Sequence, residues 1–311
     1  MHVIISHTVW QEKIGSGSFG EVFAGEDVQT HEKVAIKRES SSAHVPQLQH
    51  EYTMYQELLD VVGFPRVIYG GTEGQYHVIV MEHLGPSLAA LQAASPGGRL
   101  PLRTVAYCAL QTLQRLRVLH ERGIVFRDVK SGQFCVGRAG EDITRSPTIY
   151  MIDFGLAAWY INDSGQHIPG KKIDLKRSKT GTARYASLNV HRGKEHTRRD
   201  DIESLAYVLI ELVKGRLPWS NLRALSSREG WKKTMSMKEQ TLIYELASGL
   251  PDAFGLLLEY ARELEFTDTP DYNWMERLFA DLYQKLSPRG PGEEGERPLV
   301  WGVEAEPNGG W

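Results

Sequence analysis

The sequence has few cysteines, no long hydrophobic run and almost no net charge. Cys108 and Cys135 are the only cysteines among 311 residues, and both stand in apolar surroundings. We therefore expect two reduced, buried thiols in an intracellular protein, and neither a disulfide nor a metal site. The longest apolar stretch, 205–213, is interrupted by Tyr207 and Glu211 and is too short to span a bilayer.

The net charge and the amino-terminal residues exclude further classes of protein. A net charge of -3 indicates no general affinity for nucleic acid or for a membrane. Residues 1–7 have too short an apolar run and too little positive charge for a signal peptide. We expect a soluble monomer in the cytoplasm, with the nucleus as the alternative compartment.

The length of the chain and its 41% hydrophobic residues predict a large core divided between two lobes. We place a strand-rich lobe at 1–82, a hinge at 83–87 and a helical lobe at 88–286. Helices are expected over these ranges: 102–121, 201–213, 238–246, 251–264 and 271–286. The remainder, 287–311, reads as a flexible tail because it begins with Ser, Pro, Gly and Glu residues that cannot support packing. For its tryptophans Trp301 and Trp311, exposure is favoured over docking.

A glycine-rich stretch lies between two predicted strands in 10–26. Glycines there permit close approach of the backbone and turn amides toward phosphate oxygens. The predicted nucleotide contacts are Ile14, Gly15, Gly17, Ser18, Gly20 and Val22. A plain glycine-rich hairpin is the alternative, whereas a dinucleotide-binding loop is disfavoured because 21–24 alternates like a returning strand and opens no helix.

A lysine and a glutamate follow at positions that suit a phosphate site. Ala35 and Lys37 share one face of the predicted strand 33–38, so a flat adenine could lie above a cationic phosphate ligand. Glu51, on a predicted helix at 46–60, could neutralise and orient Lys37. A solvated lysine and an exposed helix acid are the alternatives. Two further strands, at 67–71 and 76–81, complete an expected five-stranded sheet.

Two short apolar runs each end in an acid, Asp128 in the run 123–134 and Asp153 in 150–155. Phosphoryl transfer needs one carboxylate to orient the attacking hydroxyl and another to hold a magnesium ion on the nucleotide phosphates. Lys130 could then neutralise charge on the transferring group. A buried acid and a surface lysine would be the structural alternatives.

These runs resemble the catalytic loop and the Asp-Phe-Gly motif of eukaryotic protein kinases. The segments 179–189, 198–205 and 217–219 resemble the casein kinase 1 family of Ser/Thr protein kinases in particular, where Ser-Ile-Asn replaces the usual Ala-Pro-Glu. Here the triplet is Ser187-Leu-Asn. The resemblance covers about residues 8 to 285.

The resemblance implies a bilobal α+β protein kinase fold, with an antiparallel five-stranded sheet and one main helix in the first lobe and a larger, mainly helical second lobe. It implies ATP and Mg²⁺ as cofactors. It assigns Asp128 and Lys130 to catalysis, Asp153 and Gln133 to the metal, and Arg184 to a substrate anion site. The adenine site would include a gatekeeper, two hinge residues and two pocket residues, namely Met81, Glu82, Leu84, Cys135 and Ile152. Asp201 is expected to hydrogen-bond the backbone of the catalytic loop.

Two departures from the kinase pattern keep a rival function open. Phe126 stands where protein kinases usually have His, and Gln133 stands where they have a metal-binding Asn. The Gln133 amide could still bind magnesium, or it could point away and bind nothing. The rival is therefore a pseudokinase that binds nucleotide or a partner without turnover. A kinase for small molecules is disfavoured because 181–189 resembles a platform for protein substrates.

Basic residues around that platform predict acidic or phosphorylated segments in the protein substrates. The cations are Lys171, Lys172, Lys176, Arg177, Lys179, Arg184, Arg192, Lys194, Arg198 and Arg199. A solvated charged face is the alternative for each of them alone. Asn221 and Gly230 replace a glycine and a lysine of the family's anion site, so we expect a weak gain from a phosphate already present on the substrate.

Overall fold

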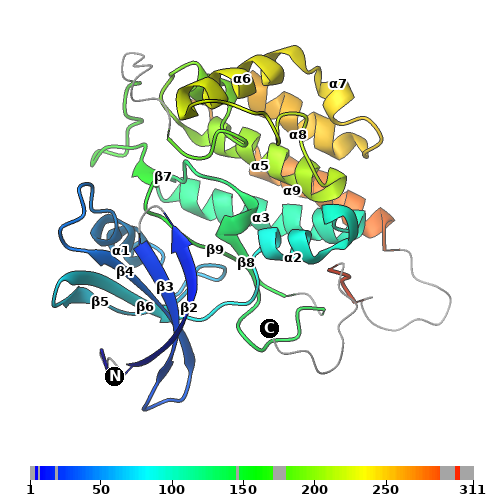
Figure 1. Cartoon of the computed structure of the whole chain (residues 1–311). Helices are drawn as coiled ribbons and strands as arrows, with labels where there is room; N and C mark the ends of the chain where they lie inside the picture. The colour runs from blue at the N-terminus through cyan, green and yellow to red at the C-terminus, as the bar shows by residue number, and fades with distance from the viewer. Residues whose placement is uncertain are drawn as a thin grey trace. The chain divides into compact units, whose positions relative to one another are not determined.

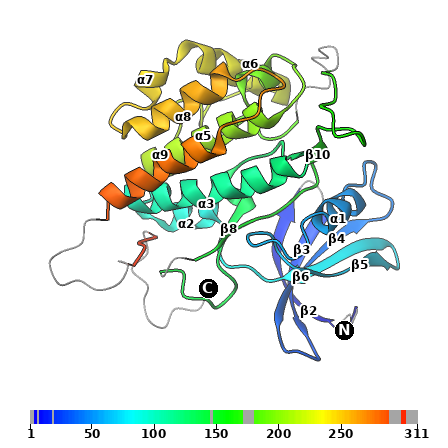
Figure 2. The ribbon, with the colours of Figure 1, turned by 180° about the vertical axis from the view of Figure 1, so that it is seen from behind.

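The computed structural model describes residues 4–5, 8–17, 20–144, 147–170, 180–287 and 298–301. The chain divides into two compact units. The first comprises Met1–Pro86, Cys135–Ile143 and Pro147–Ala157, and the second comprises Ser87–Phe134, Thr144–Ser146 and Ala158–Trp301 within the described chain. Figures 1 and 2 show the strands of the first unit and the helices of the second from opposite sides.

The first unit is built on an antiparallel sheet with the strand order β1-β2-β3-β4-β6-β5. The strands are β1 (Ile4–Ile5), β2 (Thr8–Gly17), β3 (Gly20–Asp27), β4 (Lys33–Ser40), β5 (Val67–Glu73) and β6 (Tyr76–Glu82). The five predicted strands are therefore confirmed, and the two-residue β1 adds a sixth at the edge. Alternate residues of the neighbouring strands β4 and β6 form its core, namely Val34, Ile36, Val78 and Val80.

One helix of the first unit, α1 (Leu48–Gln56), is the predicted main helix. It begins later and ends earlier than the predicted range 46–60. It buries Leu48, Met54 and Tyr55, and it also buries the carboxylate of Glu51. A short pair of strands, β8 (Phe134–Val136) and β9 (Ile149–Met151), precedes the Asp-Phe-Gly motif.

The second unit is mainly helical. Its helices are α2 (Leu88–Ala94), α3 (Leu102–Glu121), α4 (Leu188–His191), α5 (Arg198–Lys214), α6 (Ser227–Gln240), α7 (Ile243–Leu246), α8 (Asp252–Glu263) and α9 (Tyr272–Lys285), with 3-10 turns η1 (Pro96–Gly98) and η2 (Ser131–Gln133). A small ladder joins β7 (Ile124–Val125) to β10 (Ala158–Trp159). The predicted continuous helix at 238–246 is wrong, because α6 ends at Gln240 and α7 begins only at Ile243.

The central helix of the second unit is α5, which packs against α3 and α8. Figure 1 shows it crossing the middle of the helical unit. A capping box between Thr197 and Asp200 begins it, and Gly215 ends it in a left-handed conformation with φ of 81°. Because α5 is surrounded by other helices, its polar residues are buried with its apolar ones, as its sequence predicted.

The end of the described chain is not exposed, so the prediction for Trp301 is wrong. Trp301 is 3% exposed and Leu299 is 3% exposed. The Ser95 hydroxyl donates to the Trp301 carbonyl oxygen at 2.9 Å, and the Thr104 hydroxyl donates to that of Val300 at 2.7 Å. These two hydroxyls lie far from the tail in the sequence. They donate hydrogen bonds to its backbone carbonyl oxygens, so the tail can bury its apolar side chains without leaving these oxygens unpaired. Trp311 lies outside the described residues.

Two expectations from composition can also be compared with the structure. Cys108 and Cys135 are both free and buried, as predicted. Burial raises the pKa of Cys135 to about 12, so this thiol stays protonated. None of the described helices is both long and apolar enough to cross a membrane.

Candidate active site

Lys37 in the first unit is held between two carboxylates. Its Nζ lies 2.6 Å from Glu51 Oε2 and 2.8 Å from Asp153 Oδ1. Burial opposes the charge of Lys37, but the two carboxylates outweigh it and raise the pKa above its ordinary value. The predicted pairing of Lys37 with Glu51 is therefore present, and the contact with Asp153 is an addition that sequence spacing did not reveal.

The Glu51 carboxylate is the most deeply buried group of this cluster, at 1% exposure. Burial raises its pKa to about 7, the Lys37 ammonium opposes the shift, and the charge of Asp153 reinforces it. One ammonium is thus shared by two acids in a site with little water. If Asp153 bound a cation, the Lys37 ammonium would pair mainly with the Glu51 carboxylate.

The Asp-Phe-Gly motif is anchored on α1. The Asp153 N–H donates to the Tyr55 hydroxyl at 3.1 Å, and Phe154 packs edge-on against the Tyr55 ring with centroids 4.9 Å apart. Asp153 has a left-handed backbone with φ of 68°, which is uncommon outside glycine and clusters at functional sites. Its carboxylate is 26% exposed, so it can bind a ligand from solvent.

The glycine-rich stretch joins the end of β2 to the start of β3, and these strands pair as the predicted hairpin. Gly20 has φ of 137°, and a Cβ atom there would lie 2.2 Å from the Arg38 carbonyl oxygen, so only glycine fits. Val22 lies opposite Lys37 in the sheet, while Gly15 pairs with Val22 and Gly17 with Gly20. Ile14 lies on the same strand and is 44% exposed. Ser18 lies outside the described residues.

The predicted adenine contacts lie on neighbouring segments of the first unit. Ala35 on β4 faces Met81 on β6 in register. Leu84 pairs with Arg138 in an antiparallel bridge. In this bridge the His83 carbonyl oxygen accepts a hydrogen bond and the Gly85 N–H donates one, so the backbone groups of Leu84 itself are not used.

The other predicted adenine contacts differ in how well they could reach a bound adenine. The Glu82 N–H donates to the Arg66 carbonyl oxygen, so of its two backbone groups only the carbonyl could meet adenine. The Glu82 carboxylate instead binds Arg66 N and Arg138 Nε. Cys135 is buried and Ile152 is half-buried in the same unit.

Asp128 in the second unit is oriented by two donors. Lys130 Nζ donates to its Oδ2 at 2.6 Å, and the Thr182 hydroxyl donates to its Oδ1 at 2.8 Å. A Cβ atom at Gly181 would lie 2.5 Å from the Arg127 carbonyl oxygen, so glycine permits the segment to approach this closely. Sequence reasoning found Asp128 and Lys130 but gave Thr182 no role, although it stands in the quoted platform segment.

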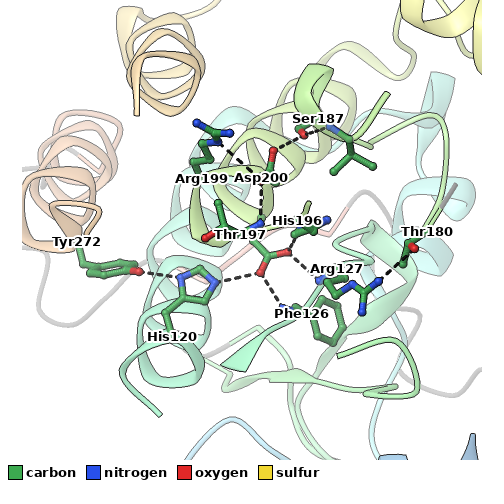
Figure 3. A network of polar contacts seen from close by, with 12 residues as sticks. His120, Phe126, Arg127, Thr180, Ser187, His196, Thr197, Arg199, Asp200 and Tyr272 are labelled. Atoms are coloured by element: carbon green, nitrogen blue, oxygen red, sulfur yellow. Dashed lines mark hydrogen bonds and ion pairs between the residues drawn. The ribbon is translucent and has the colours of Figure 1, made fainter. Parts of the chain in front are cut away.

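The backbone of the catalytic loop is fastened to Asp201, as predicted. The N–H groups of Phe126 and Arg127 donate to its two carboxylate oxygens at 2.7 and 2.8 Å. Figure 3 shows that imidazoles of His120 and His196 meet the same carboxylate, at 3.0 and 2.9 Å. Although burial opposes ionisation, these imidazoles hold the pKa of Asp201 well below its usual range.

This anchor explains why phenylalanine is compatible with the loop at position 126. The loop is fastened through the Phe126 backbone, and the ring is fully buried with the core of the unit. Arg127 has φ of 73°, and its guanidinium donates to the Thr180 hydroxyl at 3.2 Å, also drawn in Figure 3. Both residues thus hold the loop shape without a polar side chain at position 126.

Gln133 lies at the end of η2, five residues after Asp128 in the chain, and is 4% exposed. Its N–H donates to the Lys130 carbonyl oxygen at 3.0 Å, which closes the turn. The metal role of Gln133 stays a prediction.

The Arg184 side chain is 42% exposed and contacts a buried acid of the same unit, and its predicted anion role stays a prediction. Its guanidinium lies 3.3 Å from Glu211 Oε1, and its carbonyl oxygen accepts a hydrogen bond from Trp219 Nε1 at 2.7 Å. Sequence analysis treated Glu211 only as an interruption of an apolar stretch. The other cations at 171–179 lie outside the described residues.

The platform triplet is held by buried polar contacts. Ser187 caps α4 by accepting from Val190 N, and its hydroxyl donates to Asp200 (Figure 3). Lys238 is fully buried, and its Nζ donates to the carbonyl oxygens of Ala183 and Ala186. Sequence reasoning did not single out Lys238, which lies in the last turn of α6, where a lysine is ordinarily exposed.

The residues present fit magnesium and a nucleotide. Asp153 offers a hard carboxylate oxygen and Lys37 an ammonium, while Gly15 and Gly20 next to the β2–β3 turn carry no side chain. In the described part of the chain, no cluster of His, Cys, Asp or Glu forms a complete metal site. Magnesium needs none, since it usually takes one or two carboxylates together with waters and substrate phosphates.

Comparison with known proteins agrees with this geometry. The protein kinase domain model matches residues 9–267. Casein kinase I homolog 2 of Schizosaccharomyces pombe is 40% identical over 271 residues, which are 87% of this chain and 61% of the relative. Casein kinase I homologs 1 and 3 of the same yeast are 37% and 38% identical, over 92% and 91% of this chain and 63% of each relative. The chain thus spans less than two thirds of the length of these curated relatives. It belongs to the protein kinase domain family, and the predicted resemblance to casein kinase 1 is confirmed by these relatives.

Proposed function

We propose that this protein is a Ser/Thr protein kinase that transfers the γ-phosphoryl group of Mg-ATP to hydroxyls of protein substrates. The observation that carries the proposal is the Lys37 cluster, in which an ammonium bridges Glu51 and Asp153. A phosphate site needs a held cation, and a metal site needs an accessible carboxylate. Family membership and the casein kinase I relatives support the same reaction.

Each unit supplies one part of the reaction. In the first, Lys37 would bind nucleotide phosphates and Asp153 would hold magnesium; the metal role of Gln133 stays a separate prediction. Magnesium, when bound, neutralises charge on the phosphates. In the second, Asp128 would accept a hydrogen bond from the substrate hydroxyl, align it for attack and take its proton. Lys130, already 2.6 Å from Asp128, would counter negative charge on the transferring group.

The structure around Phe126 and Gln133, the two departures from the kinase pattern, supports an active enzyme over a pseudokinase. The change to Phe126 leaves the backbone anchor to Asp201 intact. The cluster of Lys37, Glu51 and Asp153 is complete, so a change at Gln133 would affect the strength of metal binding before it abolished the chemistry.

We further propose a preference for acidic segments in the substrate, with a weak gain from a phosphate already present. Arg228 and Lys232 are exposed one turn apart on α6, so they lie on one face of the helix. They replace the anion-site positions that Asn221 and Gly230 do not supply. A location in the cytoplasm or nucleus and a monomeric state complete the proposal.

The test is transfer of radiolabelled γ-phosphate from Mg-ATP to an acidic Ser/Thr-containing protein. The wild type should label serine and threonine, and Asp128→Asn should label them at a rate lower by about 10² to 10⁴, because it removes a positioned acid-base group. A wild type that binds ATP and transfers nothing would refute the proposed activity.

A further inference from the structure

A surface pocket of about 430 Å³ lies beside the catalytic loop within the second unit. Lys130 and Ser131 of the loop line it together with Gln92 of α2. Arg184, Tyr185 and Glu211 form another part of its wall. Since Lys130 also contacts Asp128, a peptide whose hydroxyl reached Asp128 would have neighbouring residues near this pocket.

The buried acid in the pocket wall is fully engaged by donors. Glu211 is 3% exposed, and its Oε1 receives the Ser220 hydroxyl at 3.0 Å and the Arg184 guanidinium at 3.3 Å. Its Oε2 receives the Tyr185 hydroxyl. Burial and the Glu211 charge raise the pKa of Tyr185 to about 12, so the phenol remains a donor. Glu211 therefore places a fixed negative charge against Arg184.

The backbone around Arg184 is held from two sides, which fixes where its side chain starts relative to Glu211. Trp219 Nε1 donates to the Arg184 carbonyl oxygen at 2.7 Å. The buried Nζ of Lys238 donates to the carbonyl oxygens of the nearby Ala183 and Ala186. The Arg184 side chain is 42% exposed, whereas that of Glu211 is 5% exposed. A substrate can thus touch the guanidinium, but it meets a neutralised pair.

We infer that Glu211 is a specificity-determining residue: by neutralising Arg184, it removes the advantage that a phosphate or carboxylate of the substrate would otherwise have in this pocket, so a neutral polar side chain is accepted equally well. The inference rests on the proposed kinase function and deepens it. A dianionic phosphate placed here gains the guanidinium but faces the Glu211 carboxylate a few ångströms away, so attraction and repulsion largely cancel. The preference for acidic segments is then carried by the exposed cations of α6, and Arg184 contributes little to it.

The experiment compares full-length wild type, Glu211→Gln, Arg184→Ala and the double variant on one set of peptides. Each peptide has one target serine, and phosphoserine, Asp or Ser is placed at successive positions before it. For the wild type, kcat/KM for phosphoserine and Ser peptides should agree within about twofold at the position that faces the pocket. Glu211→Gln should raise that ratio about tenfold, because a charge-assisted hydrogen bond to a guanidinium is then no longer opposed. Adding Arg184→Ala should remove the gain.

Glu239→Gln provides the matched control. Glu239 lies on α6 and pairs with the exposed Arg192, so the variant changes the net charge equally without touching the pocket. Its phosphoserine ratio should equal that of the wild type. If it rises as in Glu211→Gln, long-range charge explains the effect and the inference fails. It also fails if Glu211→Gln is folded and its ratio is unchanged.

Two further measurements keep the inference separate from folding and from activity. If Glu211→Gln does not fold, Arg184→Ala still tests the inference. Its ratio of kcat/KM for phosphoserine and Ser peptides should equal that of the wild type, and a tenfold fall would overturn the inference. If the wild type transfers no phosphate to any peptide, the proposed function fails. Glu211 is then judged by fluorescence anisotropy with the same peptides labelled, where Glu211→Gln should bind the phosphoserine peptide about tenfold tighter, and equal binding would refute its role.

Discussion

The Thr182 hydroxyl donates to Asp128 Oδ1 at 2.8 Å, while Lys130 donates to the other oxygen of the same carboxylate. A residue of the platform segment thus fixes the orientation of the predicted catalytic acid-base group. The two oxygens are held from opposite ends, so rotation of the Asp128 carboxyl group breaks a hydrogen bond.

Replacing Thr182 should therefore lower the rate and not the nucleotide affinity. Thr182→Val keeps the shape of the side chain and removes its hydroxyl, and we expect kcat to fall by about tenfold, in line with a net hydrogen bond of about 1 kcal/mol or more. Thr182→Ser should retain most of the rate. Steady-state kinetics with ATP and one acidic peptide measure both variants. An unchanged kcat in Thr182→Val would show that the hydroxyl does not position Asp128.

Glu51 should make folding stability fall as pH rises through the acidic range. Its pKa is raised to about 7 in the folded protein from 4.5, so the folded state holds a proton that the unfolded state has lost. The wild type should therefore lose up to roughly 3 kcal/mol relative to Glu51→Gln between about pH 4.5 and 7. Urea unfolding of both proteins across this range measures the difference, in which other titrating groups cancel. A constant difference would contradict the raised pKa.

Ionisation of Glu51, which lowers folding stability, should strengthen nucleotide binding. Above about pH 7 the carboxylate is charged and can hold Lys37 in place. ATP should therefore bind more tightly to the wild type as pH rises from 6 to 8, because Lys37 is then better oriented. Glu51→Gln should lack this change.

Gln133 should hold magnesium less tightly than a shorter amide. Its extra methylene adds a rotor and displaces the amide oxygen relative to Asn. Gln133→Asn should lower the magnesium concentration needed for half-maximal rate, whereas Gln133→Ala should raise it. A magnesium titration that is the same in all three proteins would mean that Gln133 is not a ligand.

Activity should not require a phosphate on the activation segment. Arg127 already donates to the Thr180 hydroxyl, and its backbone is tied to Asp201, so no added anion is needed to organise it. Protein made in a host without eukaryotic kinases, then treated with phosphatase, should keep its rate within about twofold. A large loss on phosphatase treatment, restored by incubation with Mg-ATP, would show that a phosphate is required.

The segment around Trp301 should stabilise the second unit. Trp301→Ala should lower the unfolding free energy by about 3–5 kcal/mol, the usual cost of truncating a buried tryptophan to alanine. Val300→Ala, at a neighbouring position that is 55% exposed, should have little effect and serves as the control. Equal stability of Trp301→Ala and wild type in urea would contradict the burial of the indole.

Much of this protein follows from its sequence alone. The alternation of Val34 and Ile36 with Ala35 and Lys37 predicted a strand, because side chains on a strand alternate between faces. The apolar stripe of 102–121 predicted α3 with both ends correct, since a helix brings residues three and four apart onto one face. These features depend on neighbours along the chain.

Contacts between distant residues were decided only by the tertiary structure. The charge of Arg184 is legible in the sequence, but its neutralisation by Glu211, 27 positions away, depends on how α5 meets the platform. In the same way, tail composition indicated exposure, whereas Ser95 and Thr104 provide the donors that let Trp301 be buried. Local pattern reports which groups a segment carries. Their charge balance and burial depend on the partners that folding brings to them.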